Sequence, residues 1–243
     1  VRDIALRAGL IALAVALVWL TLRLDARAAN RLYPTGAFSP RSPVGLALLV
    51  LFTGGMAQTS VNLFMPLVLQ VVHGVTPLFV SFIAIIISFG WTLGTFVVSG
   101  WSGRREDMAL QAGPIMMFAG IAVMALVAAE PMLVVLSIAA FVLGLGVGIH
   151  NIHVVARTIS HAEPGEERIT SAAVPSMRSL GTAFGAAVAG GISTMAGLGD
   201  ATEPESVGRA VSLVYAFNLV PLVLAIVFMT LLVRMGRRSR EIS

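Results

Sequence analysis

Seven long apolar segments succeed one another along the chain, and short polar stretches separate them. Each segment holds at least 21 residues, which is enough for an α-helix to cross the hydrocarbon core of a bilayer. The pattern therefore predicts an all-α polytopic bundle of seven transmembrane helices. They cover residues 4–24, 44–72, 77–101, 108–129, 132–156, 171–193 and 210–233.

Proline and glycine set the boundaries within this series. The stretch 25–43 contains three prolines, one glycine and three arginines, so it predicts a linker. The uncharged run 44–72 predicts a helix that either tilts or breaks near Gly54 and Gly55. Pro221 predicts a kink in the last helix. We expect a single helix at 1–24, a cytoplasmic linker at 25–43, a six-helix bundle at 44–234 and a cytoplasmic tail at 235–243.

Composition supports the same class and excludes several chemistries. The chain is 57% hydrophobic and 12% charged, with a mean hydropathy of +0.93, whereas about a quarter of the residues in soluble domains are charged. Cysteine is absent, which excludes disulfides, thiolate metal sites and cysteine nucleophiles. All 16 basic residues are arginine, so no lysine is present to form a Schiff base or bind phosphate in a glycine-rich loop.

Arginine is distributed unevenly between the two sides of the predicted membrane. Twelve arginines lie on one side and three on the other. The positive-inside rule makes the richer side cytoplasmic, so we expect a cytoplasmic C-terminus in a multi-pass protein of the plasma membrane, specifically a bacterial inner membrane. The twelve are Arg23, Arg27, Arg31, Arg41, Arg104, Arg105, Arg157, Arg168, Arg234, Arg237, Arg238 and Arg240.

An outer N-terminus before seven helices also fits a heptahelical receptor or an opsin. The missing lysine excludes a retinal Schiff base, and the missing cysteines remove the usual extracellular disulfide. Arg2, Asp3 and Arg7 stand directly before the first helix and indicate the end of a loop rather than a natural start. We therefore expect the chain to be a fragment of a longer protein.

One predicted helix, at 171–193, combines small residues with a charge. Fifteen of its 23 residues are Gly, Ala, Ser or Thr, which allow neighbouring helices to approach closely in lipid. Gly181 and Gly185 form a GxxxG pair, and Arg178 lies three residues before it, so the arginine projects toward the same neighbours. Two interpretations are open: an intramembrane arginine with a function, or one that extends to the cytoplasmic headgroups.

Three short patterns lie along the predicted bundle. The first is the Gly-x-Gly-x-Gly run at 144–148, and the second is the Arg-x-Leu-Gly sequence at 178–181 with the small residues after it. The third is PLVLQVVHGVTPL at 66–78. Together they resemble the C-terminal half of the major facilitator superfamily, in its fourteen-helix drug:proton antiporter branch, and their order and spacing extend the resemblance over residues 44–234.

The resemblance implies one six-helix half of a secondary transporter, preceded by one helix. It implies proton-coupled efflux of drug-like or other small lipophilic compounds, with the proton as coupling ion and an N-terminal bundle, missing here, as partner. The alternative is a non-transporting membrane subunit, or a truncated remnant with a helix-packing role. Neither is an enzyme, and neither needs a cofactor.

The chain departs from the family pattern at residues 100–107. The family repeats Gly-x-Leu-x-Asp-Arg in this loop, whereas this chain reads GWSGRRED. By resemblance the segment is a cytoplasmic gating loop that contains Arg104, Arg105 and Asp107. Either gating at this position differs from that of the family, or Glu106 or Asp107 carries the charge pairing.

Two groups of amide and histidine side chains within the predicted spans are candidates for function. Gln58 and Asn62 are four residues apart, and either contact substrate in a cavity or hold helices together. His150 and His153 share a helix face, with Asn151 beside them. The histidines either relay protons and contact substrate, or satisfy backbone carbonyls, and a zinc site would need further ligands.

The glycine pairs and the positions of the acidic residues bear on helix packing and on acid–base chemistry. The pairs Gly90 with Gly94 and Gly144 with Gly148 predict helix-packing seams, like Gly181 with Gly185. All twelve acidic residues fall outside the predicted spans, which argues against catalysis by paired carboxylates. It also implies that any proton-coupling carboxylate lies outside this chain.

Overall fold

The computed structural model describes residues 9, 13, 16–21, 23–25, 27–28 and 31–242, with no side chains beyond 238. Apart from turns, the described residues are helical, which confirms the all-α prediction. Most of the predicted first helix lies outside the described residues. The elements are α2 (Pro43–Val71), α3 (Pro77–Val98), α4 (Gly103–Val127), α5 (Leu133–Ser160), α6 (Glu167–Met195), the 3-10 helix η1 (Leu198–Asp200), α7 (Pro204–Phe217) and α8 (Leu219–Ile242).

Five helical stretches of the described residues are long and apolar enough to cross a membrane. They are α2, α3, α4, α5 and the combined stretch Pro204–Arg238 of α7 and α8. Helix α6 is not among them, although it is 29 residues long. Its small residues, together with Glu167, Arg168 and Arg178, lower its hydropathy. The polar character of α6 therefore distinguishes it from the rest of the bundle.

Two helices start in the same way, with a hydroxyl residue directly before a proline. The Ser42 side chain accepts a hydrogen bond from the Gly45 amide at 2.9 Å, and Pro43 occupies the first turn of α2. Thr76 accepts from the Phe79 amide at 3.4 Å at the start of α3. The cap satisfies a free N–H group, and proline needs no partner in a first turn.

Two expectations about helix interruptions have different outcomes. Helix α2 runs unbroken through Gly54 and Gly55, so of the two alternatives for this run, a continuous helix or one that breaks there, the structure has the continuous helix. The last predicted helix, in contrast, is interrupted near Pro221, because α7 ends at Phe217 and α8 begins at Leu219. Pro221 cannot donate to the Phe217 carbonyl, and its ring clashes with that carbonyl in a continuous helix.

Helices α4 and α5 extend further than the apolar pattern predicts. Residues 104–107 form the first turns of α4, so the expected gating loop is helical. Helix α5 continues beyond residue 156 to Ser160, so Arg157 lies inside the helix and not in a loop. Asp107 is consequently within a helix, which corrects the expectation that acids lie only in loops and termini.

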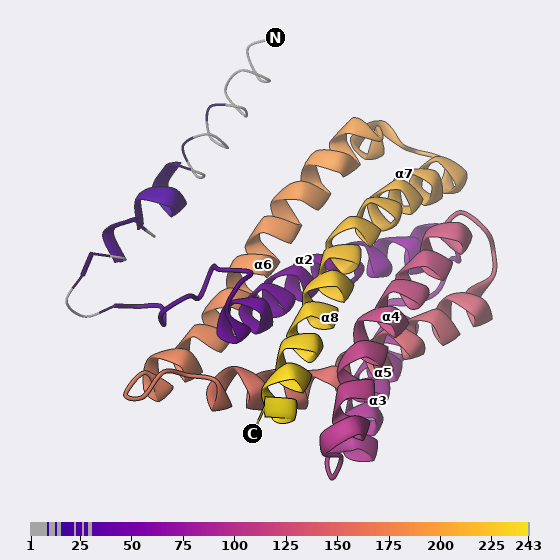
Figure 1. The fold of residues 1–243 in the computed structure, drawn as a ribbon. Helices are drawn as coiled ribbons and strands as arrows, with labels where there is room; N and C mark the ends of the chain where they lie inside the picture. Colours follow the sequence, from indigo (N-terminus) through magenta and orange to yellow (C-terminus); the bar gives the residue numbers. More distant parts are fainter. Residues whose placement is uncertain are drawn as a thin grey trace.

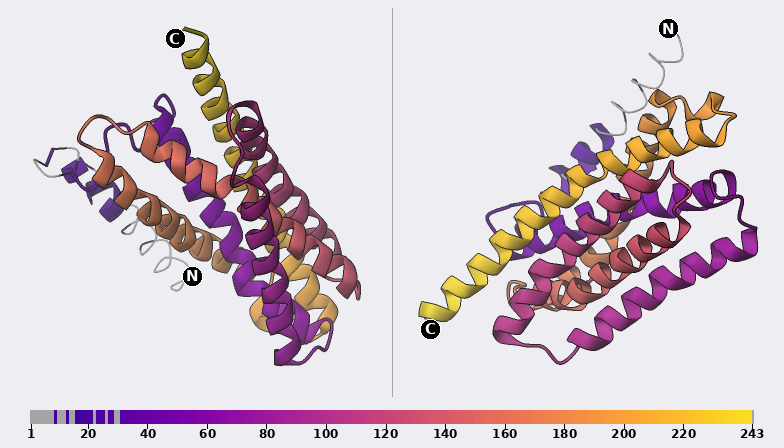
Figure 2. Two further views of the ribbon diagram at one scale, coloured as in Figure 1. Left: turned by 90° about the horizontal axis from the view of Figure 1, so that it is seen from below. Right: turned by 90° about the vertical axis from the view of Figure 1, so that its right-hand side faces the viewer.

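The helices pack in two groups, and contacts of α8 with α4 and of α2 with α5 join them. Helix α5 packs against α3 and α4, whereas α2 packs against α6 and α8, and α8 also contacts α4. Figure 1 shows α8 crossing near α2, with α6 on one side and α3 and α4 on the other, while α5 runs from the side of α3 and α4 toward the start of α6. The views in Figure 2 show the same arrangement. We call the end where α2, α4 and α6 begin and α3, α5 and α8 end the arginine-rich end.

Glycines set the closest helix contacts. Ideal Cβ atoms on Gly144 and Gly148 of α5 would each lie 2.1 Å from a carbonyl oxygen of α3, and those on Gly90 and Gly94 would each lie 2.6 Å from one of α5. On α6, a Cβ at Gly181 would lie 2.0 Å from the Phe52 carbonyl oxygen of α2. No side chain fits at these distances, so the backbones touch only because the residues are glycine.

Candidate functional site

A small polar cavity lies where α2, α5 and α6 meet. Its volume is about 20 Å³, which is room for about one water molecule. We call it the Arg178 cavity, after its only charged lining residue in the described chain. The lining residues are Val50, Leu51, Gly54, Gly55, Gln58, Trp91, Met117, Val147, His150, Asn151 and Arg178.

Arg178 is eleven residues into α6, which is about 16 Å along the helix axis. Its Nη2 donates a hydrogen bond to Oδ1 of Asn151 on α5 at 2.5 Å. The side chain is half-buried, and the structure places its guanidinium against a neighbouring helix. Gly55 allows this position, since an added Cβ there would lie 2.8 Å from the Arg178 carbonyl oxygen.

The two histidines of α5 turn to different neighbours. Nδ1 of His150 donates to the Gly146 carbonyl oxygen at 2.7 Å, and the ring packs on Gly113 of α4. Nε2 of His153 donates to the Val98 carbonyl oxygen at the end of α3 at 3.1 Å. Both rings are buried and hold a backbone carbonyl. No group of three potential metal ligands occurs within the described part of the chain.

Gln58 and Asn62 of α2 are separated by the fold. Gln58 lines the Arg178 cavity and is half-buried. Asn62, one turn further along the helix, is exposed and does not line it. Of the polar residues predicted from the sequence, the cavity thus brings together Gln58, His150, Asn151 and Arg178.

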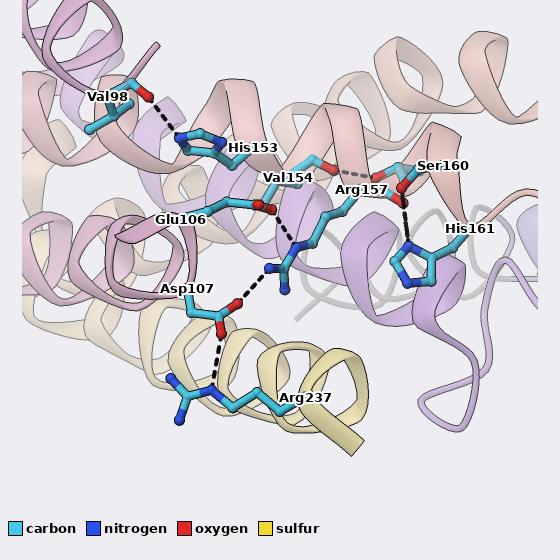
Figure 3. A network of polar contacts seen from close by, with 10 residues as sticks. Val98, Glu106, Asp107, His153, Val154, Arg157, Ser160, His161 and Arg237 are labelled. Carbon is cyan, nitrogen blue, oxygen red and sulfur yellow. Dashed lines mark hydrogen bonds and ion pairs between the residues drawn. The ribbon is translucent and has the colours of Figure 1, made fainter. Parts of the chain in front are cut away.

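A second polar group, the charged network, joins three helices at the arginine-rich end (Figure 3). Arg157 of α5 donates from Nε to Glu106 at 2.6 Å and from Nη2 to Asp107 at 2.5 Å. Arg237 of α8 donates from Nε to the other oxygen of Asp107 at 3.0 Å. The side chains of Asp107 and Arg157 are only 2% and 7% exposed. The network therefore fixes α4, α5 and α8 to one another.

Sequence reasoning included part of this network and missed the rest. Asp107 was a candidate, and the charge pairing was expected at Glu106 or Asp107. Arg157 and Arg237 were interpreted only as markers of the cytoplasmic side. The signal for Arg157 is its place directly after a predicted span, 132–156, that contains no charged residue. Arg104 and Arg105 are exposed, and neither has an ion pair within the described residues.

The segment before α2 is packed against the bundle. We call residues 31–42 the strap. The Thr35 amide and hydroxyl donate to the two carboxylate oxygens of Glu166 at 2.7 and 2.8 Å, which ties the strap to the turn before α6. Ala37 is 3% exposed within the core. Burial, with Asp25 as a second cause, raises the pKa of Tyr33.

The chain is similar in sequence to a family profile and to two curated proteins. The family profile described as Major Facilitator Superfamily matches residues 4–186. Two curated proteins, each named probable multidrug-efflux transporter and coming from two strains of Mycobacterium tuberculosis, are 26% identical over 221 residues. The alignment covers 88% of this chain and 46% of each relative, so the chain spans about half the length of the curated relatives it matches.

Proposed function

Because this chain belongs to the Major Facilitator Superfamily, we propose that it is one six-helix half of a secondary active transporter, preceded by one further helix. The observation that carries the proposal is the Arg178 cavity, where a charged side chain from α6 meets amide groups of α2 and α5. A charge at this depth is expensive in a membrane and marks a pathway for a solute or an ion by default.

The exposed surface of α6 supports a second bundle as partner. Ser176, Ser179 and Thr182 are exposed on α6, and Met195 at its end is the only described large apolar side chain of α6 among the exposed ones. Helix α3, in contrast, exposes Phe82 and Phe96, which suit lipid. Small and hydroxyl residues favour helix–helix contact over contact with acyl chains. Rocking of two such bundles around a midplane site is the general mechanism of alternating access.

The charged network gives this half the rigidity that rocking requires. Asp107 binds both Arg157 and Arg237, so α4, α5 and α8 move together at the arginine-rich end. We place this end in the cytoplasm, with the C-terminus, because arginine is enriched on the cytoplasmic side of membrane proteins. The plasma membrane is the proposed location.

Substrate and coupling follow by analogy with the relatives. We propose efflux of drug-like or other lipophilic compounds, since both relatives are named for multidrug efflux. The proposed coupling ion is the proton, and the carboxylate that carries it belongs to the second bundle, because no Asp or Glu lines the Arg178 cavity in the described chain. The alternative is a membrane subunit with a packing role, which α6 favours by its exposed small residues.

The test is reconstitution in liposomes with a fluorescent efflux substrate and a pH gradient. Residues 1–243 alone should give no saturable flux, because one bundle has no partner to move against. Joined to the second bundle, the wild type should transport, and Arg178→Ala should lose transport at normal membrane abundance. Arg209→Ala, at an exposed pair, is the matched control. Absence of flux in the joined wild type would favour the packing role, and unchanged flux in Arg178→Ala would refute the role proposed for the Arg178 cavity.

A further inference from the structure

The polar side of the Arg178 cavity carries a positive charge and no negative one. Its polar side chains in the described chain belong to Gln58, Trp91, His150, Asn151 and Arg178. The Trp91 indole can only donate, and the guanidinium of Arg178 has five N–H groups and no acceptor. Within the described residues, Arg178 uses one of these donors, on Asn151. The cavity is therefore rich in free donors.

No acid of the described chain forms an ion pair with Arg178 or lines the cavity. Apart from Asp107, the described acids lie at helix ends, in turns or in the strap region. Asp107 is inside α4, but it is bound by Arg157 and Arg237. A partly desolvated arginine without a counter-charge is costly, and charges in membranes are normally paired. The partner for Arg178 must then come from outside the described chain.

We propose that the Arg178 cavity binds an acidic oxygen group, a carboxylate or a comparable oxyanion, which enters from its open side. This inference rests on the proposed function and gives the chemistry of the group that the site recognises. The planar guanidinium can hold two oxygens of one group side by side. Asn151 accepts from Nη2 and so fixes the plane of the guanidinium.

The size of the cavity limits what enters it. About 20 Å³ is room for one oxygen of an acid group, so the second oxygen and the body of the molecule stay at the mouth of the cavity. Two sources supply such a group: a carboxylate side chain of the second bundle, or the acid group of a transported organic anion. Both make the same contacts with Arg178, and the experiments below separate them.

Trp91 reports directly on this site, because it lines the same cavity. The chain has three tryptophans, so Trp19→Phe with Trp101→Phe leaves Trp91 as the only indole. This variant, in nanodiscs of uncharged lipid, is titrated with benzoate, benzamide and benzylammonium. Benzoate should change the Trp91 emission saturably, and the two other probes should bind at least about 10-fold more weakly, as for loss of one charge-assisted hydrogen bond. This series needs no change at Arg178.

Variants then assign the binding to the guanidinium. Arg178→Gln should weaken benzoate binding by about 10-fold or more. Arg178→Lys should bind benzoate with an affinity between those of the wild type and Arg178→Gln, because it keeps the charge but loses the planar guanidinium. Arg209→Gln removes the charge of a side chain that is 68% exposed. This variant should bind benzoate like the wild type. A benzoate signal that is absent, or equalled by benzamide or benzylammonium, overturns the inference.

The complete transporter distinguishes the two sources. If the second bundle supplies the carboxylate, benzoate binds the single half but not the joined protein, and Arg178→Gln lowers the flux of acidic and neutral substrates alike. If the substrate supplies it, benzoate binds both, and Arg178→Gln lowers the flux of carboxylates more than that of their amides. Benzoate binding without any flux would leave the inference standing and remove the proposed function. Flux that depends on Arg178, without benzoate binding, would overturn the inference and leave the proposed function standing.

Discussion

Asp107 is the most buried side chain of the charged network, and it links α4 to both α5 and α8. It is 2% exposed and accepts from two arginines on two different helices, whereas Glu106 accepts from one and is 21% exposed. Removing one partner of a buried ion pair leaves the other partner buried without compensation. The two acids, although neighbours in sequence, are thus expected to differ strongly in their contribution to stability.

Asp107→Asn should lower the free energy of unfolding by about 3–5 kcal/mol, because it leaves the buried Arg157 with one counter-charge fewer. Thermal unfolding in detergent measures the loss. Glu205→Gln is the control, since its pair with Arg209 is exposed and should contribute little. Equal midpoints for the two variants would show that the network does not stabilise the bundle.

His73 predicts a pH dependence outside the membrane spans. It follows α2, and burial lowers its pKa from the ordinary value of 6.5, while its buried Nε2 has no hydrogen-bond partner among the described residues. The unfolded chain therefore binds more protons than the folded one near that pKa, so the stabilising term is present above pH 6.5 and is lost as pH falls. His73→Gln should reduce the drop in unfolding midpoint between about pH 7.5 and pH 5. An unchanged drop would contradict this assignment.

At the residue scale, the sequence indicated the participants but not their pairing. Arg178 and Asn151 were both candidates, yet they are 27 positions apart, and only the relative register of α5 and α6 brings them together. His150 and His153 look alike in sequence, whereas the structure orients them to different carbonyl groups. Pairings between helices depend on rotation about each helix axis, which hydropathy does not report.

Helix starts show where apolar patterning misleads. Helices α4, α6 and α7 begin at 103, 167 and 204, four to six residues before the apolar segments predicted at 108, 171 and 210. Each extra turn contains charged residues, such as Arg104 and Glu167. Hydropathy reports which part of a helix suits lipid, whereas backbone hydrogen bonding continues into the polar interface. Where proline follows a capping hydroxyl, as at Pro77, the predicted and observed starts agree.

Glycines on α6 provide a matched test of helix packing. Gly181→Ala would place a Cβ 2.0 Å from the Phe52 carbonyl oxygen, so it should push α6 away from α2 and cost roughly 1–3 kcal/mol or more. Gly190→Ala meets nothing within 4 Å and should be neutral, or stabilising by up to about 1 kcal/mol. The unfolding midpoints of the two variants are compared. Equal destabilisation by both would mean that the close contact of Gly181 with α2 does not determine how α6 packs.

At the scale of the whole molecule, the strap connects the first helix to the bundle. The predicted linker was expected to be only a boundary, but Glu166 holds it at Thr35 through two hydrogen bonds. Tyr33 and Phe38 add an edge-to-face ring contact with centroids 5.0 Å apart. The sequence could not show this, because Glu166 is 131 residues from Thr35. The two ends of this contact approach only when the bundle is assembled.

Trypsin can measure how tightly the strap is held. The chain has no lysine, so cleavage in this region is confined to arginines such as Arg31 and Arg41. Glu166→Ala should accelerate cleavage there several-fold, because the strap then opens more often. Glu163→Ala removes an exposed carboxylate from the same turn and should leave the rate unchanged. If both variants are cleaved at the wild-type rate, the Glu166 contact does not hold the strap.

The unbroken course of α2 has a mechanical consequence. A continuous helix of 29 residues is a rod about 43 Å long, and the strap holds one of its ends. A rod that pivots near that end by about 10° moves its opposite end by about 7 Å, as simple lever geometry on this length requires. Because α2 continues through Gly54 and Gly55, a small rotation at the strap becomes a large displacement on the far side of the membrane.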